Sequence, residues 1–299
     1  MALLIITTIL WAFSFSLIGE YLAGSVDSYF SVLMRVGLAA LVFLPFLRTR
    51  GQSPRTIVLY ILVGAMQLGI MYLLAFHAYL YLTVSEFLLF TVFTPLYITL
   101  IYDLISGRRL RWGYLLSAGL AVLGAAIIRY DKVSDHFWTG LLLVQLSNIC
   151  FAIGMVGYKR LMEVRPMPQR NAFAWFYVGA FIVAATAWLM LGNPQRLPTT
   201  GLQWGILVWL GVVASGLGYF MWNYGATQVD AGTLGIMNNV HVPAGLLVNL
   251  AIWQEQPHWP SFIIGALVIL ASLWVHRRWV APHSAQTVDD RKRGSALSE

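Results

Sequence analysis

Long apolar stretches alternate with short polar connections along almost the whole chain, from Ala2 to Trp279. Most stretches contain about 18 to 22 residues, enough for a helix to cross the roughly 30 Å hydrocarbon core of a bilayer. The pattern therefore predicts an all-α integral membrane protein. Its ten predicted transmembrane helices are 2–20, 29–47, 56–75, 78–102, 111–129, 138–158, 171–191, 202–222, 231–253 and 260–279.

Positive charges indicate how these helices are oriented, because cytoplasmic loops retain lysine and arginine. With the N-terminus inside, the outer segments contain only Arg129, Lys132 and Arg196. The inner segments contain Arg48, Arg50, Arg55, Arg108, Arg109, Arg111, Lys159, Arg160, Arg165, Arg170, Arg277, Arg278, Arg291, Lys292 and Arg293. We therefore expect a multi-pass protein of the bacterial inner membrane with both termini in the cytoplasm.

Composition changes this picture little. Hydrophobic residues make up 59% of the chain and charged residues 10%, which excludes a soluble protein. The net charge of +7 follows the membrane topology, so we expect no nucleic-acid partner. The first segment lacks a basic start and has full membrane length, so we expect a retained helix and not a cleaved signal peptide. The polar residues 281–299 are expected to form a disordered cytoplasmic tail.

The second half of the chain repeats the first. Aligning the predicted fourth and ninth helices places Ala78 opposite Ala226 and Pro95 opposite Pro243, so the alanine and the proline have the same separation in both halves. The predicted first and sixth helices, and the second and seventh, show weaker matches in the same order. Because each half has an odd number of spans, the repeats should be inverted in the membrane, as in many secondary transporters. We expect one five-helix repeat at 1–130 and another at 137–280.

These features resemble the drug/metabolite transporter superfamily, in its ten-helix, EamA-like branch of metabolite carriers. The motifs that carry the resemblance are Leu10-Trp11-Ala12, an early arginine in the second helix, and the alanine and proline of the fourth. Three longer stretches narrow it to the carboxylate, amino-acid and amine transporter group. They run from Met1 to Phe15, from Phe173 to Tyr177 and from Gly235 to Asn239.

The resemblance implies a secondary transporter that imports a small carboxylate by alternating access, with biotin as the expected substrate. An exporter of amino acids or related metabolites is the alternative. The residues themselves support a carrier of an anion or zwitterion. Expected partners are the substrate, membrane lipid and protons, with no cofactor.

Two ionisable residues within the predicted spans are candidates for transport chemistry, because buried charges in membranes commonly serve a pathway. Arg35 in the second helix could bind a substrate carboxylate through two parallel hydrogen bonds. It could also form a structural ion pair with Glu86 or extend toward the interface. Glu86 in the fourth helix is a candidate for proton coupling, since opening such a pair would free its carboxylate.

Polar and aromatic residues on the fourth and ninth helices are expected to face each other across the repeat axis. Asn238, Asn239 and His241 could bind the polar head of a substrate, or could only join helices through hydrogen bonds. Phe90 and Phe93 would supply apolar contacts from the equivalent face. Pro95 and Pro243 remove backbone hydrogen bonds and are candidates for gating bends.

Further substrate-binding candidates are spread over the other helices. Trp11 is expected near the middle of the membrane, where it could stack on a ring or cover an apolar chain, or simply pack. The remaining candidates are Ser14, Gln67, Asn148 and Asn223. We expect no enzyme and no metal site, because the histidines are scattered and Cys150 is the only cysteine.

Overall fold

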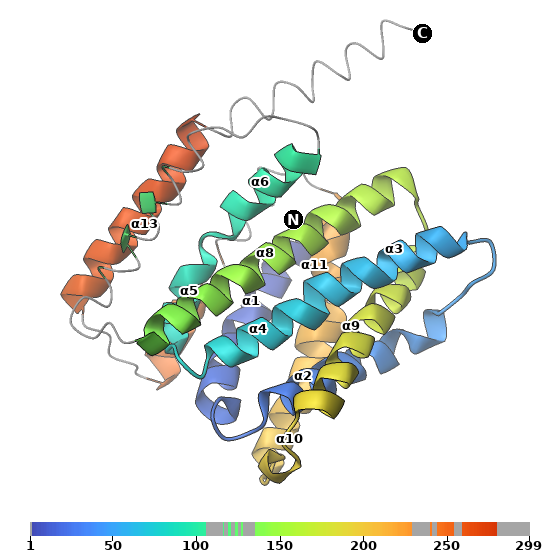
Figure 1. Ribbon diagram of the computed structural model, residues 1–299, viewed down its shortest axis with the longest axis horizontal. Coiled ribbons are helices and arrows are strands. Elements are labelled where there is room, and N and C mark those ends of the chain that lie inside the picture. Colours follow the sequence, from blue (N-terminus) through green and yellow to red (C-terminus); the bar gives the residue numbers. More distant parts are fainter. Residues whose placement is uncertain are drawn as a thin grey trace, which may run out of the picture. The chain divides into compact units, whose positions relative to one another are not determined.

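The computed structural model is helical throughout its regular elements. It describes residues 2–105, 116, 119–120, 123–124, 127, 135–228, 240, 244–253 and 259–279, and no strand occurs among them. The chain divides into two compact units, Met1–Pro95 with Ser134–Glu255, and Leu96–Val133 with Gln256–Glu299. The first unit contains most of the described helices (Figure 1) and all of the residues that form the candidate site.

Among the described residues, seven segments are long and apolar enough to cross a membrane, judged by length and composition. They are Ala2–Leu22, Ser28–Phe46, Pro54–Ala78, Val84–Ile105, His136–Val164, Gln169–Leu191 and Gly201–Ala226. These correspond to seven of the ten predicted helices. A shorter apolar helix, Ala244–Trp253, falls within the predicted ninth span. The predicted fifth span, the first part of the ninth and the tail 281–299 lie mostly or wholly outside the described residues.

Several of these segments combine more than one helical element. Up to residue 105 the elements are α1 (Ala2–Leu17), η1 (Ile18–Leu22), α2 (Ser28–Phe43), η2 (Leu44–Phe46), α3 (Pro54–Gly64), η3 (Ala65–Ile70), α4 (Met71–Ala78), α5 (Val84–Thr91) and α6 (Thr94–Ile105). From residue 135 they are α8 (Asp135–Val164), α9 (Gln169–Leu191), η5 (Pro194–Arg196), α10 (Gly201–Val208), η6 (Trp209–Leu217), α11 (Gly218–Ala226), η7 (Asn249–Trp253) and α13 (Trp259–Trp279). The π-helical elements η3 and η6 interrupt the third and eighth predicted spans, where wider turns change the direction of side chains.

Capping side chains define where several helices begin. Asp27 accepts a hydrogen bond from the backbone N–H of Phe30, and Ser53 caps α3, whose first residue is Pro54. Thr83 and Glu86 form a reciprocal capping box at α5. This box corrects the predicted fourth span, which begins at Val84 and not at residue 78, because the turn 79–83 separates it from α4.

The same turn changes the interpretation of one repeat match. Ala78 is the last residue of α4 and ends the segment Pro54–Ala78, and Ala226 is the last residue of α11 and ends the segment Gly201–Ala226. The two alanines therefore do not lie in the fourth and ninth helices. Each alanine nevertheless ends a helix that directly follows a π-helical element: α4 follows η3, and α11 follows η6.

Close helix crossings build the first unit. α2 and α3 both pack against α9, η6 packs against α2, η3 against α9, α4 against α8, and α1 against α11. At the α3–α9 crossing, a Cβ added to Gly64 would overlap the carbonyl oxygen of Phe176, and one added to Gly179 would overlap that of Ile61. Only glycine permits the two backbones to approach this closely.

Two loops at the same end of the first unit are joined by hydrogen bonds. The backbone N–H of Asp27 donates to the Arg196 carbonyl over 2.8 Å, and an Arg196 Nη donates to the Gly24 carbonyl. The Asn193 N–H also donates to the Asp27 carboxylate over 3.3 Å. The connection between α1 and α2 is thus fixed to the connection between α9 and α10.

Candidate functional site

A cavity lies inside the first unit, surrounded by α1, η1, α2, α4, α5, α8, α11 and the first residue of α6, Thr94. Its volume is about 80 Å³, which accommodates several water molecules at roughly 10–15 Å³ each. A larger ligand therefore requires the lining to widen. Most lining side chains are apolar or aromatic, and a few polar groups are set among them, as is common for small-molecule sites.

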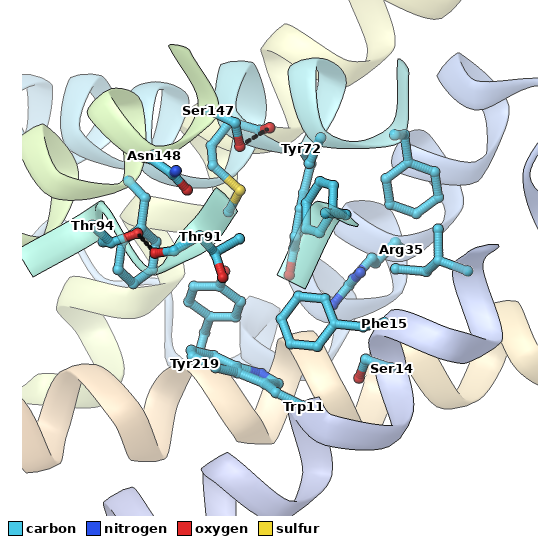
Figure 2. Close-up of a pocket in the computed structure, with 16 residues that line it drawn as sticks. Trp11, Ser14, Phe15, Arg35, Tyr72, Thr91, Thr94, Ser147, Asn148 and Tyr219 are labelled. Atoms are coloured by element: carbon cyan, nitrogen blue, oxygen red, sulfur yellow. Dashed lines mark hydrogen bonds between the residues drawn. The ribbon is translucent and has the colours of Figure 1, made fainter. Parts of the chain in front are cut away.

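Figure 2 shows how the polar groups are distributed: Arg35 lies on one side of the cavity, and Thr91, Thr94 and Asn148 lie on the other. Trp11 and Tyr219 lie between them along one wall. The cavity is therefore polar at two ends and apolar in the middle.

Arg35 is only 3% exposed, although it carries a permanent positive charge. Its Nε donates a hydrogen bond of 2.6 Å to Ser215 Oγ. Its guanidinium carbon lies 4.1 Å from the centre of the Tyr72 ring, which adds a cation–π interaction. The Tyr72 hydroxyl also lies close enough to interact with the guanidinium. A guanidinium has five N–H donors, so two hydroxyl partners leave donors for an anion.

Ser215 connects three helices around this arginine. Its hydroxyl shares a hydrogen bond of 2.9 Å with the Tyr72 hydroxyl, and its backbone carbonyl accepts one of 2.7 Å from Tyr177. Ser215 lies in the π-helical element η6, directly before Gly216. Small residues here permit α2 to pack closely, so that Arg35 meets a polar group inside an apolar bundle.

Aromatic rings form the wall between the two polar ends. Trp11 packs against Tyr219, with ring centroids 4.5 Å apart, and its Nε1 donates to the Ala214 carbonyl over 3.0 Å. Phe15 and Phe87 continue this surface, with centroids 6.0 Å apart. Because the Trp11 nitrogen is bonded to backbone, the indole is held in one orientation and can present its face to a ligand.

The opposite end is built at a break in the fourth predicted span. α5 ends at Thr91 and α6 starts at Thr94, with Pro95 as its second residue. Proline has no N–H to donate to the Thr91 carbonyl, and the Thr94 hydroxyl donates to that carbonyl instead, over 2.7 Å. The Phe90 carbonyl accepts from the Asn148 amide nitrogen over 3.0 Å. Side chains thus satisfy the backbone groups that the break releases.

These hydrogen bonds also determine what this end offers a ligand. The Thr91 hydroxyl donates to the Leu88 carbonyl, and the Ser147 hydroxyl to the Met71 carbonyl. Ser147, Thr94 and Asn148 use their donors on protein, so their oxygen lone pairs are what they present to the cavity. One end of the cavity therefore donates hydrogen bonds and the other accepts them.

The structure brings four sequence-predicted site residues to this cavity: Trp11, Ser14, Arg35 and Asn148. Gln67 and Asn223 are fully buried and hydrogen-bond to each other through their side-chain amides, over 3.2 and 3.5 Å. Their partnership occupies groups that we expected to bind substrate. Neither is part of the described lining.

Three further candidates on the fourth predicted span are buried outside this lining: Phe90, Phe93 and Glu86. Glu86 is 6% exposed and accepts a hydrogen bond of 2.9 Å from the Thr83 N–H in the capping box. No Arg35–Glu86 ion pair is recorded within the described residues. Asn238, Asn239, His241 and Pro243 lie outside the described residues, so their roles stay predictions.

Sequence analysis missed several lining residues, notably Tyr72, Thr91, Thr94 and Tyr219. Helical spacing could have found some of them. Tyr219 precedes the candidate Asn223 by one turn, and Phe15 and Ile18 share a face with Trp11 and Ser14. Tyr72 has no such signal, because the π-helical element before it changes which residues of the third span face inward. In the described part of the chain, no group of His, Cys, Asp and Glu residues is placed to hold a metal ion.

Comparison with known proteins places this geometry in context. The family model described as "EamA-like transporter family" matches residues 1–130 and 138–277. The "Biotin transporter" of Salmonella typhimurium is 83% identical over 299 residues, covering all of both chains. That of Escherichia coli K12 is 82% identical with the same coverage. The "Probable biotin transporter" of Pseudomonas aeruginosa is 56% identical over 279 residues, covering 93% of this chain and 97% of the relative.

A solved crystal structure supports the fold independently of close sequence similarity. It has a TM-score of 0.64 and 18% sequence identity, and the match covers 92% of this chain and 95% of the other. At this identity the likeness concerns the fold alone. The curated relatives are transporters by name, which agrees with our expectation that the chain is not an enzyme.

Proposed function

The chain belongs to the EamA-like transporter family, and on that premise we propose that it imports biotin across the inner membrane as a secondary transporter. Its family and its multiple apolar helices make it a multi-pass membrane protein with a small-molecule substrate. The names of relatives that are 82–83% identical over the full chain support biotin as that substrate.

The observation that carries this proposal is the opposed polarity of the two cavity ends. Biotin has a carboxylate at the end of an apolar chain and a ureido ring with two N–H donors at the other. Arg35 offers hydrogen-bond donors and a positive charge to the carboxylate. Thr94 and Asn148 offer acceptors to ureido N–H groups, while Trp11 and Phe87 cover the apolar middle.

Alternating access between two inverted repeats is the mechanism we propose. The family model supports it, because it matches twice, over halves close to the predicted repeats. Helix packing supports it as well, because contacts between the halves occur in matching pairs. The second helix of one half packs against the π-helical element of the other: α2 against η6, and α9 against η3. The first helix of one half packs against the helix that follows that element in the other: α1 against α11, and α8 against α4. Substrate sites near the middle of such repeats commonly include interrupted helices, as at the break before Pro95.

The orientation has both termini in the cytoplasm. The joined loops at Asp27 and Arg196 support the placement of both loops on one side, and the distribution of lysine and arginine makes that the outer side. Pro95 and Pro243 are the proposed gating bends. Glu86 is the proposed proton-coupling residue, supported by its burial next to the cavity-lining Phe87.

Uptake of radiolabelled biotin tests the proposal. Cells that cannot synthesise biotin should accumulate it saturably only when they produce this protein, and a proton uncoupler should abolish the accumulation. An unlabelled amino-acid mixture should not compete. If membranes contain the protein but uptake does not depend on it, biotin import is wrong, and export of amino acids becomes the function to test.

A further inference from the structure

Two buried hydroxyl groups on the elements that surround Arg35 have no recorded hydrogen-bond partner. Ser31 is 1% exposed and Tyr79 is 7% exposed, and no partner is recorded for either side-chain oxygen in the described structure. Buried polar side chains are nearly always paired with protein, water or ligand. Two unpaired hydroxyls in one part of the bundle therefore indicate a position that a ligand completes.

Helix geometry places both hydroxyls on the same side of the arginine. Ser31 precedes Arg35 by one turn of α2, so both share a face. On the neighbouring α4, the rings of Tyr72 and Phe76 lie 4.1 and 6.0 Å from the guanidinium carbon. Tyr79 directly follows this helix and continues the same face.

A ring contact fixes the relative direction of the two helices. Tyr29, near the start of α2, packs on His77 at the end of α4, with centroids 4.5 Å apart. Ser31 and Tyr79 are therefore both displaced from Arg35 toward the N-terminus of α2. In the proposed orientation, that is the outer side. Burial raises the pKa of Tyr79, and the positive charge of Arg35 opposes this rise, which is consistent with their proximity.

The chemistry of this cluster fits one kind of ligand. The Arg35 Nη groups, the Ser31 hydroxyl and the Tyr79 hydroxyl can all donate, and a carboxylate accepts about four hydrogen bonds through its two oxygens. The Tyr79 ring stacks on Phe87, with centroids 4.2 Å apart and an interplanar angle of 16°, and Phe87 lines the cavity. Tyr79 thus lies directly behind the cavity wall.

We propose that Ser31 and Tyr79, together with Arg35, form the subsite that binds the carboxylate of the substrate. This inference rests on the proposed function and deepens it, since it assigns the two residues that distinguish a carboxylate from a neutral end group. Both hydroxyl oxygens are covered in this structure, so binding includes a small rearrangement in which Arg35 and the hydroxyls converge on the anion.

The test compares biotin with its uncharged amide in equilibrium binding to the purified full-length protein. Ser31→Ala and Tyr79→Phe should each weaken biotin binding about tenfold, the effect of losing one hydrogen bond to a charged group. Amide binding should not change. Tyr158→Phe is the matched control: it removes a buried tyrosine hydroxyl that bonds to Gln169 and does not line the cavity, so it should change neither affinity. Both test variants should retain wild-type thermal stability, because neither lost hydroxyl has a recorded partner.

Unchanged biotin affinity in both test variants would overturn the subsite, and so would an equal loss for biotin and its amide. A second measurement distinguishes failure of the subsite from failure of the proposed function. It records whether acetate raises the thermal midpoint of the wild type and of the two variants. If the wild type does not bind biotin but is stabilised by acetate, and both variants lose that stabilisation, biotin is the wrong substrate and the subsite stands as a site for small carboxylates. If neither biotin nor acetate stabilises the wild type, both proposals are wrong.

Discussion

At the scale of single residues, the cavity depends on one arginine whose groups serve different purposes. The Nε of Arg35 is bonded to Ser215 and its plane lies over Tyr72, which fixes the side chain. In the proposed site, its Nη groups bind the substrate carboxylate. A lysine would retain the charge, but it could not make the Nε bond and the bidentate contact together.

Arg35→Lys should therefore reduce biotin uptake at low substrate concentration by about tenfold or more. The measurement is initial uptake rate against biotin concentration, corrected for protein in the membrane. Arg160→Lys is the control, because Arg160 is exposed and forms a surface ion pair with Glu163. Wild-type uptake by the Arg35 variant would contradict a bidentate role.

Sequence alone could identify Arg35, Trp11 and Asn148 as candidates, because charged, amide and mid-membrane aromatic groups are conspicuous among apolar residues. It could not show that Gln67 and Asn223 satisfy each other. It also could not find Tyr72, whose inward direction depends on a π-helical element with no clear sequence signal. Pairing between distant helices and local changes of helical pitch are tertiary properties.

At the scale of elements, interrupted helices and close crossings matter most. The break between α5 and α6 is stable because Thr94 and Asn148 bond to the carbonyls that it releases. The α3–α9 crossing is close because two glycines leave room for backbone.

Pro95→Ala should slow transport several-fold while leaving biotin affinity nearly unchanged. The new N–H can donate to the Thr91 carbonyl, which favours a continuous helix over the break. Uptake rate and equilibrium binding measure the two effects separately. Pro54→Ala is the control, since Pro54 occupies the first turn of α3, where proline is tolerated. Wild-type transport by Pro95→Ala would show that the break is not needed for movement.

Gly64→Ala should destabilise the protein, because the added methyl group meets a backbone carbonyl that cannot rotate away. We expect a thermal midpoint in detergent several degrees below that of the wild type. Gly205→Ala tests helix propensity alone, since an added Cβ there meets nothing within 4 Å, and it should leave the midpoint unchanged or slightly higher. Equal midpoints for the Gly64 variant and the wild type would mean that the crossing adapts.

At the scale of the whole molecule, apolar periodicity predicted seven spans that the structure contains, with most boundaries within a few residues. The fourth span was misplaced at its start because the preceding turn is itself apolar and only the Thr83–Glu86 capping box marks the boundary. The ten-helix count, the inverted repeats and the membrane orientation remain predictions.

Thiol labelling tests the orientation directly. In a Cys150→Ala background, Ser25→Cys should react with a membrane-impermeant maleimide in intact spheroplasts, because the exposed Ser25 lies in a predicted outer loop. Thr49→Cys, exposed in a predicted inner loop, should react only after permeabilisation. The reverse pattern would invert the topology, and with it the assignment of Ser31 and Tyr79 to the outer side.

The dual role of Asn148 limits how this carrier could be redirected to other molecules. Its amide nitrogen bonds to the Phe90 carbonyl at the helix break, while its side chain lines the cavity. Replacing it to suit a new ligand would remove support from the broken backbone. Directed evolution of specificity should succeed more readily at apolar lining positions such as Met71, Phe87 and Phe151. Libraries built there could change cavity shape and leave the helix break intact.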